Sequence, residues 1–265
     1  MEPVFHYAER LSAPALRPWL WNYWEFRVLG DGTAPVPHHV PPDGCTSIAL
    51  VVSGGVLRHA AASGPWLEPL VVPGIPGAAY WGVRFRPECA GMALGVSPER
   101  LVNRNQPLDT LAPALARSLR TSMAGCDDFD QAVTAMDQVF DAWLSPLGEP
   151  EHVVRDAVNR LITSGGEETI AGLARALDIP PRTLLRRFRA ATGLTPKQFA
   201  RICRFRLAAF KLIEAKRPPW AQVASGTGFA DQAHMINEFK DLTGLTPEGL
   251  GEVVRKTSHG DLIGG

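Results

Sequence analysis

The chain has 265 residues, of which 45% are apolar and 20% charged, as is ordinary for a globular protein of one or two domains. Its net charge is zero, but residues 1–150 hold ten Arg, no Lys and 15 Asp or Glu, whereas residues 151–265 hold 17 Lys or Arg and 12 Asp or Glu. The resulting charges of −5 and +5 predict two domains with different partners. The basic second part is the candidate for nucleic-acid binding.

Cysteine usage and hydropathy exclude several classes of protein. The four cysteines show neither paired spacing nor a CxxC motif, which argues against a disulfide framework or a zinc site. The first six residues lack the basic segment and apolar run of a secretory signal. No apolar stretch approaches the roughly 20 residues of a membrane-spanning helix. We therefore expect a soluble cytoplasmic protein.

Residues 1–95 are rich in Pro, Gly, Trp and Val, and this composition predicts β-structure. Several short strands separated by turn residues are typical of a small barrel or sandwich. The clearest strands are expected at 46–52, 56–59, 70–72 and 79–85.

Helices are expected after this region, at 97–102, 110–123 and 127–144. The last of these has an apolar stripe at helical spacing, which predicts either packing onto the β-domain or a dimerisation helix. The stripe consists of Phe129, Val133, Met136, Phe140, Trp143 and Leu144. The Pro- and Gly-containing segment 145–150 then marks a loop or linker. We place the domain boundary there, giving domains 1–148 and 149–258.

The second domain is predicted to be all-helical and contains an internal repeat. Phe188 through Pro196 is echoed by Phe239 through Pro247, each anchor shifted by 51 residues. Two copies are too few for a solenoid, so a duplicated helical unit is the better interpretation. Helices are expected at 151–164, 170–177, 181–192, 196–215, 219–226, 231–243 and 247–256.

Each copy predicts a helix-turn-helix, at about 169–192 in the first and 219–243 in the second. The second helix of such a unit can enter the major groove of DNA. In the first copy, Leu184, Phe188 and Ala191 form an apolar face. The opposite face carries Arg182, Arg186 and Arg189, flanked by Thr183 and Arg187. Arginine bonds guanine edges and neutralises phosphates, so this face fits a DNA reader. The alternative is a solvated basic face on a surface helix.

The second copy carries less charge on its outward side. Its inward residues are Met235, Phe239 and Leu242, and its candidate DNA contacts are Gln232, Ala233, His234, Asn237 and Lys240. Gln and Asn can pair with adenine edges, although this copy could instead contact only phosphates. The helix between the copies spans about 28 Å, which nearly matches the groove repeat of about 34 Å. We expect its Arg204 to touch the DNA backbone, unless its arginines pair with acids inside the domain.

These residues resemble the AraC-type (AraC/XylS) transcription regulators, whose C-terminal domain is two helix-turn-helix units joined by a long helix. The resemblance covers residues 151–256 through Gly-Phe229-Ala-Asp231-Gln232-Ala-His234, Thr-Gly-Leu-Thr-Pro247 and Arg204-Phe-Arg. The first part is similar to a poorly characterised N-terminal domain of such regulators, through Tyr23-Trp24, Pro42-Asp43-Gly44 and Val83-Arg-Phe-Arg-Pro87. This likeness implies a β-barrel sensing domain followed by dimerisation helices.

The chain departs from the family pattern at four positions. Pro180 and Ala230 stand where a Ser or Thr usually caps the reader helices, so these helices are expected to begin at Pro181 and Asp231. Asn237 replaces a common Arg, and Glu88 replaces a common Gly. The first three changes are expected to alter affinity or the sequence read.

We therefore expect an α+β fold and a sequence-specific DNA-binding transcription regulator, not an enzyme, with no cofactor or metal. A small-molecule effector is expected on the N-terminal domain, against Trp24, Trp81 and Arg84. The other expected partners are double-stranded DNA, RNA polymerase and a second copy of the chain, with no role for a membrane.

Two alternatives stay open. One is a thiol- or metal-responsive DNA-binding sensor that uses Cys45, Cys89 and Cys126. The other is a metal-dependent enzyme using His38, His39, Asp43 and Cys45. Adjacent histidines on a strand point to opposite faces, which disfavours the enzyme.

Overall fold

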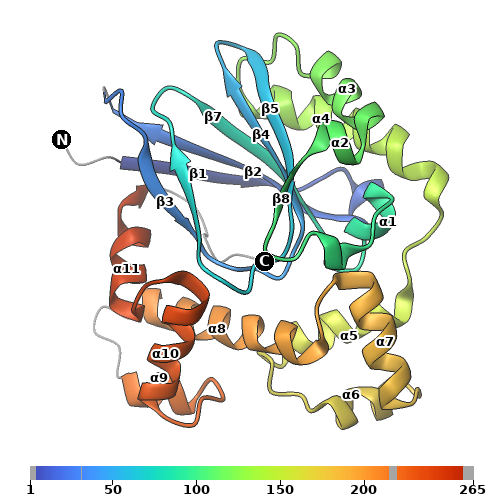
Figure 1. The fold of residues 1–265 in the computed structure, drawn as a ribbon, viewed down its shortest axis with the longest axis vertical. Helices are drawn as coiled ribbons and strands as arrows, with labels where there is room; N and C mark the ends of the chain where they lie inside the picture. Colours follow the sequence, from blue (N-terminus) through green and yellow to red (C-terminus); the bar gives the residue numbers. More distant parts are fainter. Residues whose placement is uncertain (1–3, 31, 215–219, 259–265) are drawn as a thin grey trace.

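The structure, a computed structural model, describes residues 4–30, 32–214 and 220–258. A β-rich N-terminal domain lies above a layer of C-terminal helices (Figure 1). This confirms the predicted α+β class and the order of β-rich and helical parts. The expected helix end at 215 and helix start at 219 lie outside the described residues. None of the helices in the described ranges is long and apolar enough to cross a membrane.

The N-terminal domain contains a seven-stranded sheet and a two-stranded sheet. The larger sheet has the order β8 (Asn105–Pro107), β5 (Val56–Ser63), β4 (Ser47–Ser53), β7 (Ala79–Phe85), β2 (Leu20–Leu29), β1 (Val4–Arg10) and β9 (Thr257–Ser258). The smaller sheet pairs β3 (Val36–Val40) with β6 (Leu70–Gly74). The four strands expected from the sequence are present. Within the described ranges β8 and β9 form the edges of an open sheet, so the larger sheet does not close into a barrel.

Alternation along the central strands gives the sheet two apolar faces. Ile48, Leu50 and Val52 of β4 point into the main core, as do Trp81 and Phe85 of β7. The other face carries a smaller cluster beneath the β3–β6 pair, made of Phe5, Tyr7, Phe26 and Val28. Helices therefore cover one face of the sheet, and the two-stranded sheet covers the other.

Helical segments of different lengths cover the main core. They are η1 (Pro14–Leu16), α1 (Ala90–Leu94), η2 (Pro98–Arg100), α2 (Leu108–Leu111), α3 (Pro113–Ser122), α4 (Phe129–Leu144) and η3 (Ser145–Leu147). The single helix expected at 110–123 is broken before Pro113. Ala112 has an extended φ of −142°, because a residue preceding proline avoids the helical region.

The long helix α4 packs its apolar stripe into the chain's own core. Asp128 caps its start by accepting a hydrogen bond from the Gln131 amide, 2.8 Å away. The ring of Phe140 then contacts Tyr23 and Phe85, with centroid separations of 6.5 and 5.9 Å. The stripe was expected either to pack onto the β-domain or to form a dimerisation helix, and the observed contacts are those of packing onto the β-domain.

The C-terminal domain repeats one helical unit around a shared long helix. Its helices are α5 (His152–Thr163), α6 (Ile170–Ala176), α7 (Pro181–Thr192), α8 (Pro196–Glu214), α9 (Trp220–Ser225), α10 (Gln232–Thr243) and α11 (Pro247–Arg255). In the first unit Phe188 packs on Phe199 of α8, and in the second Phe239 packs on Phe205. Each unit thus packs on its own phenylalanine of α8.

Glycines end both second helices of the repeat. Gly193 and Gly244 adopt left-handed φ values of 77° and 74°, and their amides bond back to Arg189 and Lys240 respectively. Thr195 then starts α8, since it and Gln198 exchange hydrogen bonds as a capping box. The predicted helix boundaries therefore hold to within one or two residues.

The N-terminal domain contacts both ends of this helical layer. At one end β9 adds a parallel strand to β1, and the His39 ring lies 3.3 Å from the Thr243 carbonyl oxygen. In the middle, Gly44 lies so close to Phe199 of α8 that a Cβ there would come within 2.6 Å of the ring. The two domains are therefore in contact at several separate points of the helical layer.

Glu88 forms a buried charge cluster at the other end of the interface. Its side chain is fully buried and pairs with Arg86 at 2.9 Å and with Arg155 of α5 at 3.5 Å. Arg86 also donates to Asn159, and Arg155 to the Pro18 carbonyl. The glutamate that departs from the family pattern thus connects α5 to the N-terminal domain.

Candidate nucleic-acid interface

Helix α7 separates apolar and basic residues as the sequence predicts. Pro181 occupies its first turn, where a missing N–H is tolerated. Leu184 and Phe188 are fully buried, and Ala191 is partly buried against the same core. Arg182 and Arg186 are exposed.

The four arginines of α7 have different surroundings. Arg187 pairs with Glu151, and Arg189 pairs with Glu99 of η2 at 2.7 Å. Arg182 and Arg186 have no acidic partner within the described part of the chain. The flanking Thr183 is half-buried. Two unpaired cations therefore remain on the first two turns of the helix.

Helix α10 begins with a capping arrangement that includes a predicted DNA contact. Asp231 accepts a hydrogen bond from the His234 amide at 2.7 Å, and Nδ1 of His234 lies 3.3 Å from the Ala230 amide. The imidazole also packs edge-on against Phe229. His234 thus holds the start of α10 and is half-buried.

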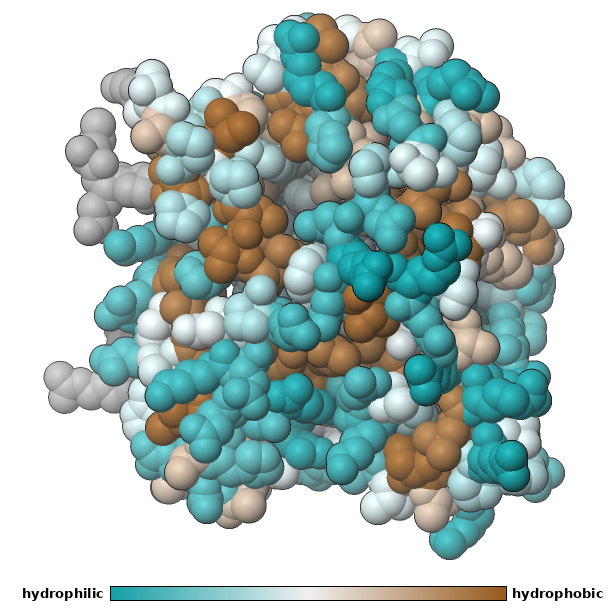
Figure 2. All heavy atoms as spheres, in the orientation of Figure 1, coloured by the Kyte–Doolittle hydropathy of each residue, from teal (hydrophilic) through white to brown (hydrophobic). Residues whose placement is uncertain are grey.

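The outward face of α10 is polar and sparsely charged. Its exposed residues include four of the five predicted contacts, Gln232, Ala233, Asn237 and Lys240. Met235, Phe239 and Leu242 are buried, as predicted. In Figure 1, α7 and α10 lie at opposite ends of α8, and in the same view hydrophilic side chains cover much of the surface of these helices (Figure 2).

Arg204, expected to touch the DNA backbone, is half-buried and makes contacts inside the domain. Its guanidinium donates to the Gly166 carbonyl oxygen at 3.3 Å and lies over the Phe229 ring at 5.8 Å. It therefore joins the loop before α6 to the loop before α10. Arg201 is likewise paired inside the domain, with Glu238 and Asp241 of α10.

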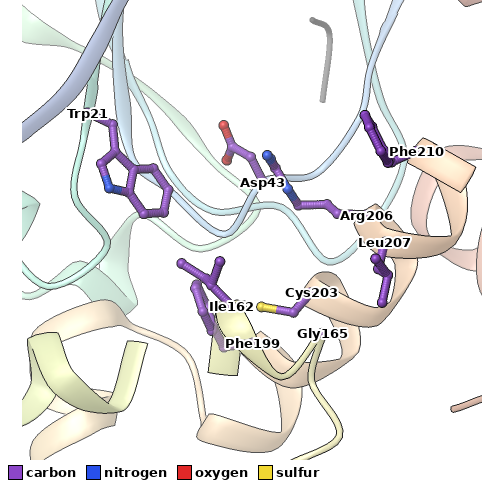
Figure 3. A pocket seen from close by; sticks show the side chains of 9 residues that line it. All are labelled: Trp21, Asp43, Ile162, Gly165, Phe199, Cys203, Arg206, Leu207 and Phe210. Atoms are coloured by element: carbon purple, nitrogen blue, oxygen red, sulfur yellow. The ribbon is translucent and has the colours of Figure 1, made fainter. Parts of the chain in front are cut away.

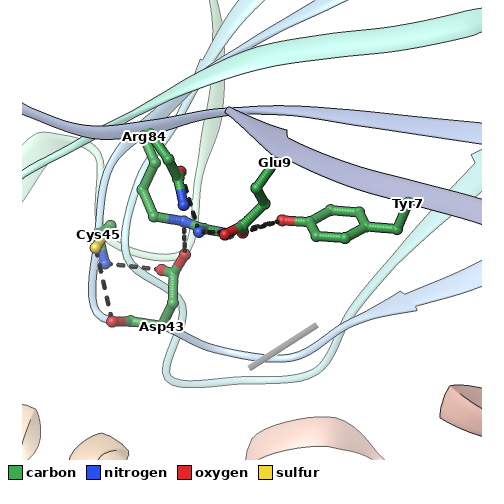
Figure 4. A network of polar contacts seen from close by, with 6 residues as sticks. Tyr7, Glu9, Asp43, Cys45 and Arg84 are labelled. Carbon is green, nitrogen blue, oxygen red and sulfur yellow. Dashed lines mark hydrogen bonds and ion pairs between the residues drawn. The ribbon is translucent and has the colours of Figure 1, made fainter. Parts of the chain in front are cut away.

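Each of the three residues expected to bind an effector makes packing or polar contacts in the structure. Trp81 is buried and donates from Nε1 to Glu25 at 2.7 Å. Arg84 bonds Glu9 at 2.9 Å and Asp43 at 2.7 Å in a network that also includes Tyr7 (Figure 4). Trp24 lies over Gly82, where a Cβ would come within 2.3 Å of the indole. Each of the three residues thus has a structural role, and effector binding by them stays a prediction.

A cavity of about 170 Å³ instead lies between the two domains (Figure 3). The N-terminal domain contributes Trp21 and Asp43, and α8 contributes most of the opposite wall. The wall residues are Ile162, Gly165, Phe199, Cys203, Arg206, Leu207 and Phe210. The side chains of Asp43 and Arg206 point toward one another in this view. Sequence patterns could not find this cavity because its walls come from distant segments.

Nothing in the described residues supports a thiol or metal sensor. All four cysteines are buried, and burial raises the pKa of each thiol, that of Cys203 to about 12. The described part of the chain holds no cluster of His, Cys, Asp and Glu able to bind a metal ion. His38 stacks on Phe26 with centroids 3.9 Å apart, whereas His39 faces Thr243.

Two family models match different parts of the chain. Residues 173–252 match one described as a helix-turn-helix domain, and residues 8–107 match one described as a domain of unknown function, DUF6597. No curated protein sequence matches the chain.

Solved structures of regulators show distant similarity. The C-terminal domain of AraT, a response regulator from Geobacillus stearothermophilus, is 22% identical, with 42% of this chain and 93% of that chain covered and a TM-score of 0.35. A probable AraC family transcriptional regulator from Rhodopseudomonas palustris is 22% identical, with coverage of 40% and 97% and a TM-score of 0.35. ToxT from Vibrio cholerae is 10% identical, with coverage of 96% and 99% and a TM-score of 0.43.

Proposed function

We propose that this chain is a sequence-specific DNA-binding transcription regulator of the AraC type acting in the cytoplasm, and the match of residues 173–252 to a helix-turn-helix domain supports this. The observation that carries the proposal is the pair of unpaired, exposed arginines on α7, Arg182 and Arg186. The N-terminal residues of a recognition helix contact base edges, and arginine bonds guanine through two parallel hydrogen bonds. These two residues therefore carry the base reading of the first unit.

The second unit takes a smaller part in recognition. Gln232 and Asn237 can hydrogen-bond adenine edges, and Lys240 can neutralise a phosphate. Thr183, Arg187, Arg189 and Ala233 border the two reading faces, whereas Arg204 and His234 hold the units in shape. Homodimerisation and contact with RNA polymerase stay predictions.

Selection of bound DNA from random sequence, using the full chain, tests this function. Arg182→Ala and Arg186→Ala should each weaken binding to the selected site by about 1–3 kcal/mol, roughly fivefold to 150-fold, and relax base preference at one position. Arg117→Ala is the matched control, because Arg117 is an exposed arginine on α3 of the N-terminal domain. Unchanged affinity in both α7 variants, or failure to select any motif at low salt, would refute the proposal.

We further propose that the effector occupies the cavity between the domains. The cavity has aromatic and aliphatic walls and one acidic and one basic side chain, which suits a small apolar molecule with a polar group. Because both domains line it, an occupant would change how tightly they dock.

Thermal-shift screening of the full chain tests whether a ligand binds in this cavity. A ligand that stabilises the parent should lose its effect in Phe210→Ala, whose side chain lines the cavity and is 44% exposed. Val71→Ala, which removes an equally exposed apolar side chain from β6, is the control. A ligand that stabilises both variants equally binds elsewhere.

A further inference from the structure

The reading face of α7 contains one apolar residue, Leu185, that its core does not use. Leu184 and Phe188 are fully buried, whereas 41% of Leu185 is exposed. A single exposed leucine on a protein surface is ordinary. This one, however, lies among the arginines of α7, and its position on the helix relates it to them.

Helical geometry places Leu185 beside the unpaired arginines. Residues three apart on a helix are neighbours, so Leu185 lies one turn after Arg182, about 60° around the axis. Arg186 follows it directly in the chain. All three residues fall within the first two turns of α7, the part of a recognition helix that reaches base edges.

The positive charges around Leu185 indicate which kind of molecule can bind against this side chain. A second protein surface would have to desolvate Arg182 and Arg186, which have no acidic partner in the described residues. The DNA major groove supplies acceptors and phosphates to these cations. It also offers one apolar group on its base edges, the C5-methyl of thymine.

We propose that Leu185 reads thymine, by packing against the C5-methyl group of a thymine next to the bases that Arg182 and Arg186 contact. The inference rests on the proposed function. It specifies that the DNA site contains a thymine next to the guanines that the arginines contact. Removing one methyl contact costs about 0.8 kcal/mol, equivalent to about fourfold in affinity at 25 °C.

Deoxyuridine provides the test, because it differs from thymidine only by that methyl group. Each thymine of the selected site is replaced singly by deoxyuridine, and affinities are measured for the parent and for Leu185→Ala. The parent should lose about threefold to tenfold at one or two positions. Leu185→Ala should bind the two DNAs equally there, whereas Leu185→Met should keep a preference for thymine.

Leu11→Ala is the control, because it removes a leucine that is 68% exposed but lies in the N-terminal domain. This variant should respond to deoxyuridine as the parent does. If Leu185→Ala keeps the parent's thymine-to-uracil ratio, or if no thymine is methyl-sensitive in a site that the parent selects, the inference is wrong and the proposed function stands. If the parent selects no site, both are wrong.

Discussion

Arg189 of the reading helix α7 forms an ion pair with Glu99 of the N-terminal domain, with 2.7 Å between Nε and Oε1. The contact continues at the end of the helix, where a Cβ on Gly193 would lie 2.8 Å from the Pro98 carbonyl oxygen. The C-terminal half of α7 is therefore docked on η2, while Arg182 and Arg186 on its first two turns have no acidic partner in the described residues. If Arg189 contacts DNA as proposed, Glu99 competes with a phosphate for this cation.

Glu99→Gln should release Arg189 to contact a phosphate. The logarithmic dependence of affinity on salt should then steepen by about 0.9, the slope contributed by one phosphate contact. Both side chains are about half exposed, so the melting temperature should hardly change. Fluorescence anisotropy across several salt concentrations measures the slope. Glu68→Gln, which changes an exposed glutamate elsewhere in the same domain, should leave it unaltered; an identical slope in Glu99→Gln would contradict the competition.

Arg204→Ala should destabilise the C-terminal domain without changing the salt dependence of DNA binding. The substitution removes a charged hydrogen bond to Gly166 and a ring contact with Phe229, a loss of about 1–3 kcal/mol. Urea denaturation measures the loss. Arg175→Ala, at an exposed position on α6, is the control. If Arg204→Ala instead flattens the salt dependence and leaves the stability unchanged, Arg204 contacts the DNA backbone.

Glu88→Gln should loosen the attachment of α5 to the N-terminal domain. Loss of this buried carboxylate leaves Arg86 and Arg155 without their shared anion, and breaking such a pair costs about 3–5 kcal/mol. Denaturant unfolding should show this loss, and limited proteolysis should show faster cleavage near residues 145–150. Glu149→Gln is the control, because the Glu149 side chain is 83% exposed. Equal stability of the two variants would show that Arg86 and Arg155 find other partners.

Stability should fall in acid because of His38. Burial, with a smaller contribution from His39, lowers the pKa of His38 from 6.5 to about 4. The unfolded chain therefore binds a proton between these values that the folded chain does not, so stability is lost as the pH falls from about 6.5 to about 4. The loss from this group is about 3 kcal/mol. Urea titrations at several pH values should show this dependence in the parent and in His59→Gln, at an exposed histidine, but a shallower one in His38→Phe.

The helices of the C-terminal domain could be predicted closely because their signals are local. Pro181 and Gly193 bound α7, and the spacing of Leu184 and Phe188 determines which side is buried. The strands were harder to predict. β2 carries the buried polar residues Asn22 and Glu25, which accept hydrogen bonds from Arg84 and Trp81 on the neighbouring strand. A pattern of apolar residues along one segment cannot show that compensation.

The sequence by itself determined that α7 presents arginines opposite an apolar face, because both follow from residues within four positions of each other. Only the tertiary structure decided which of those arginines remain unpaired. Arg189 is paired by Glu99 and Arg187 by Glu151, and these acids lie 90 and 36 positions earlier in the chain. An ion pair depends on where the fold brings two side chains, and that placement is not encoded in the neighbouring residues. The set of unpaired arginines on α7 therefore depends on the tertiary contacts of the helix as much as on the repeat.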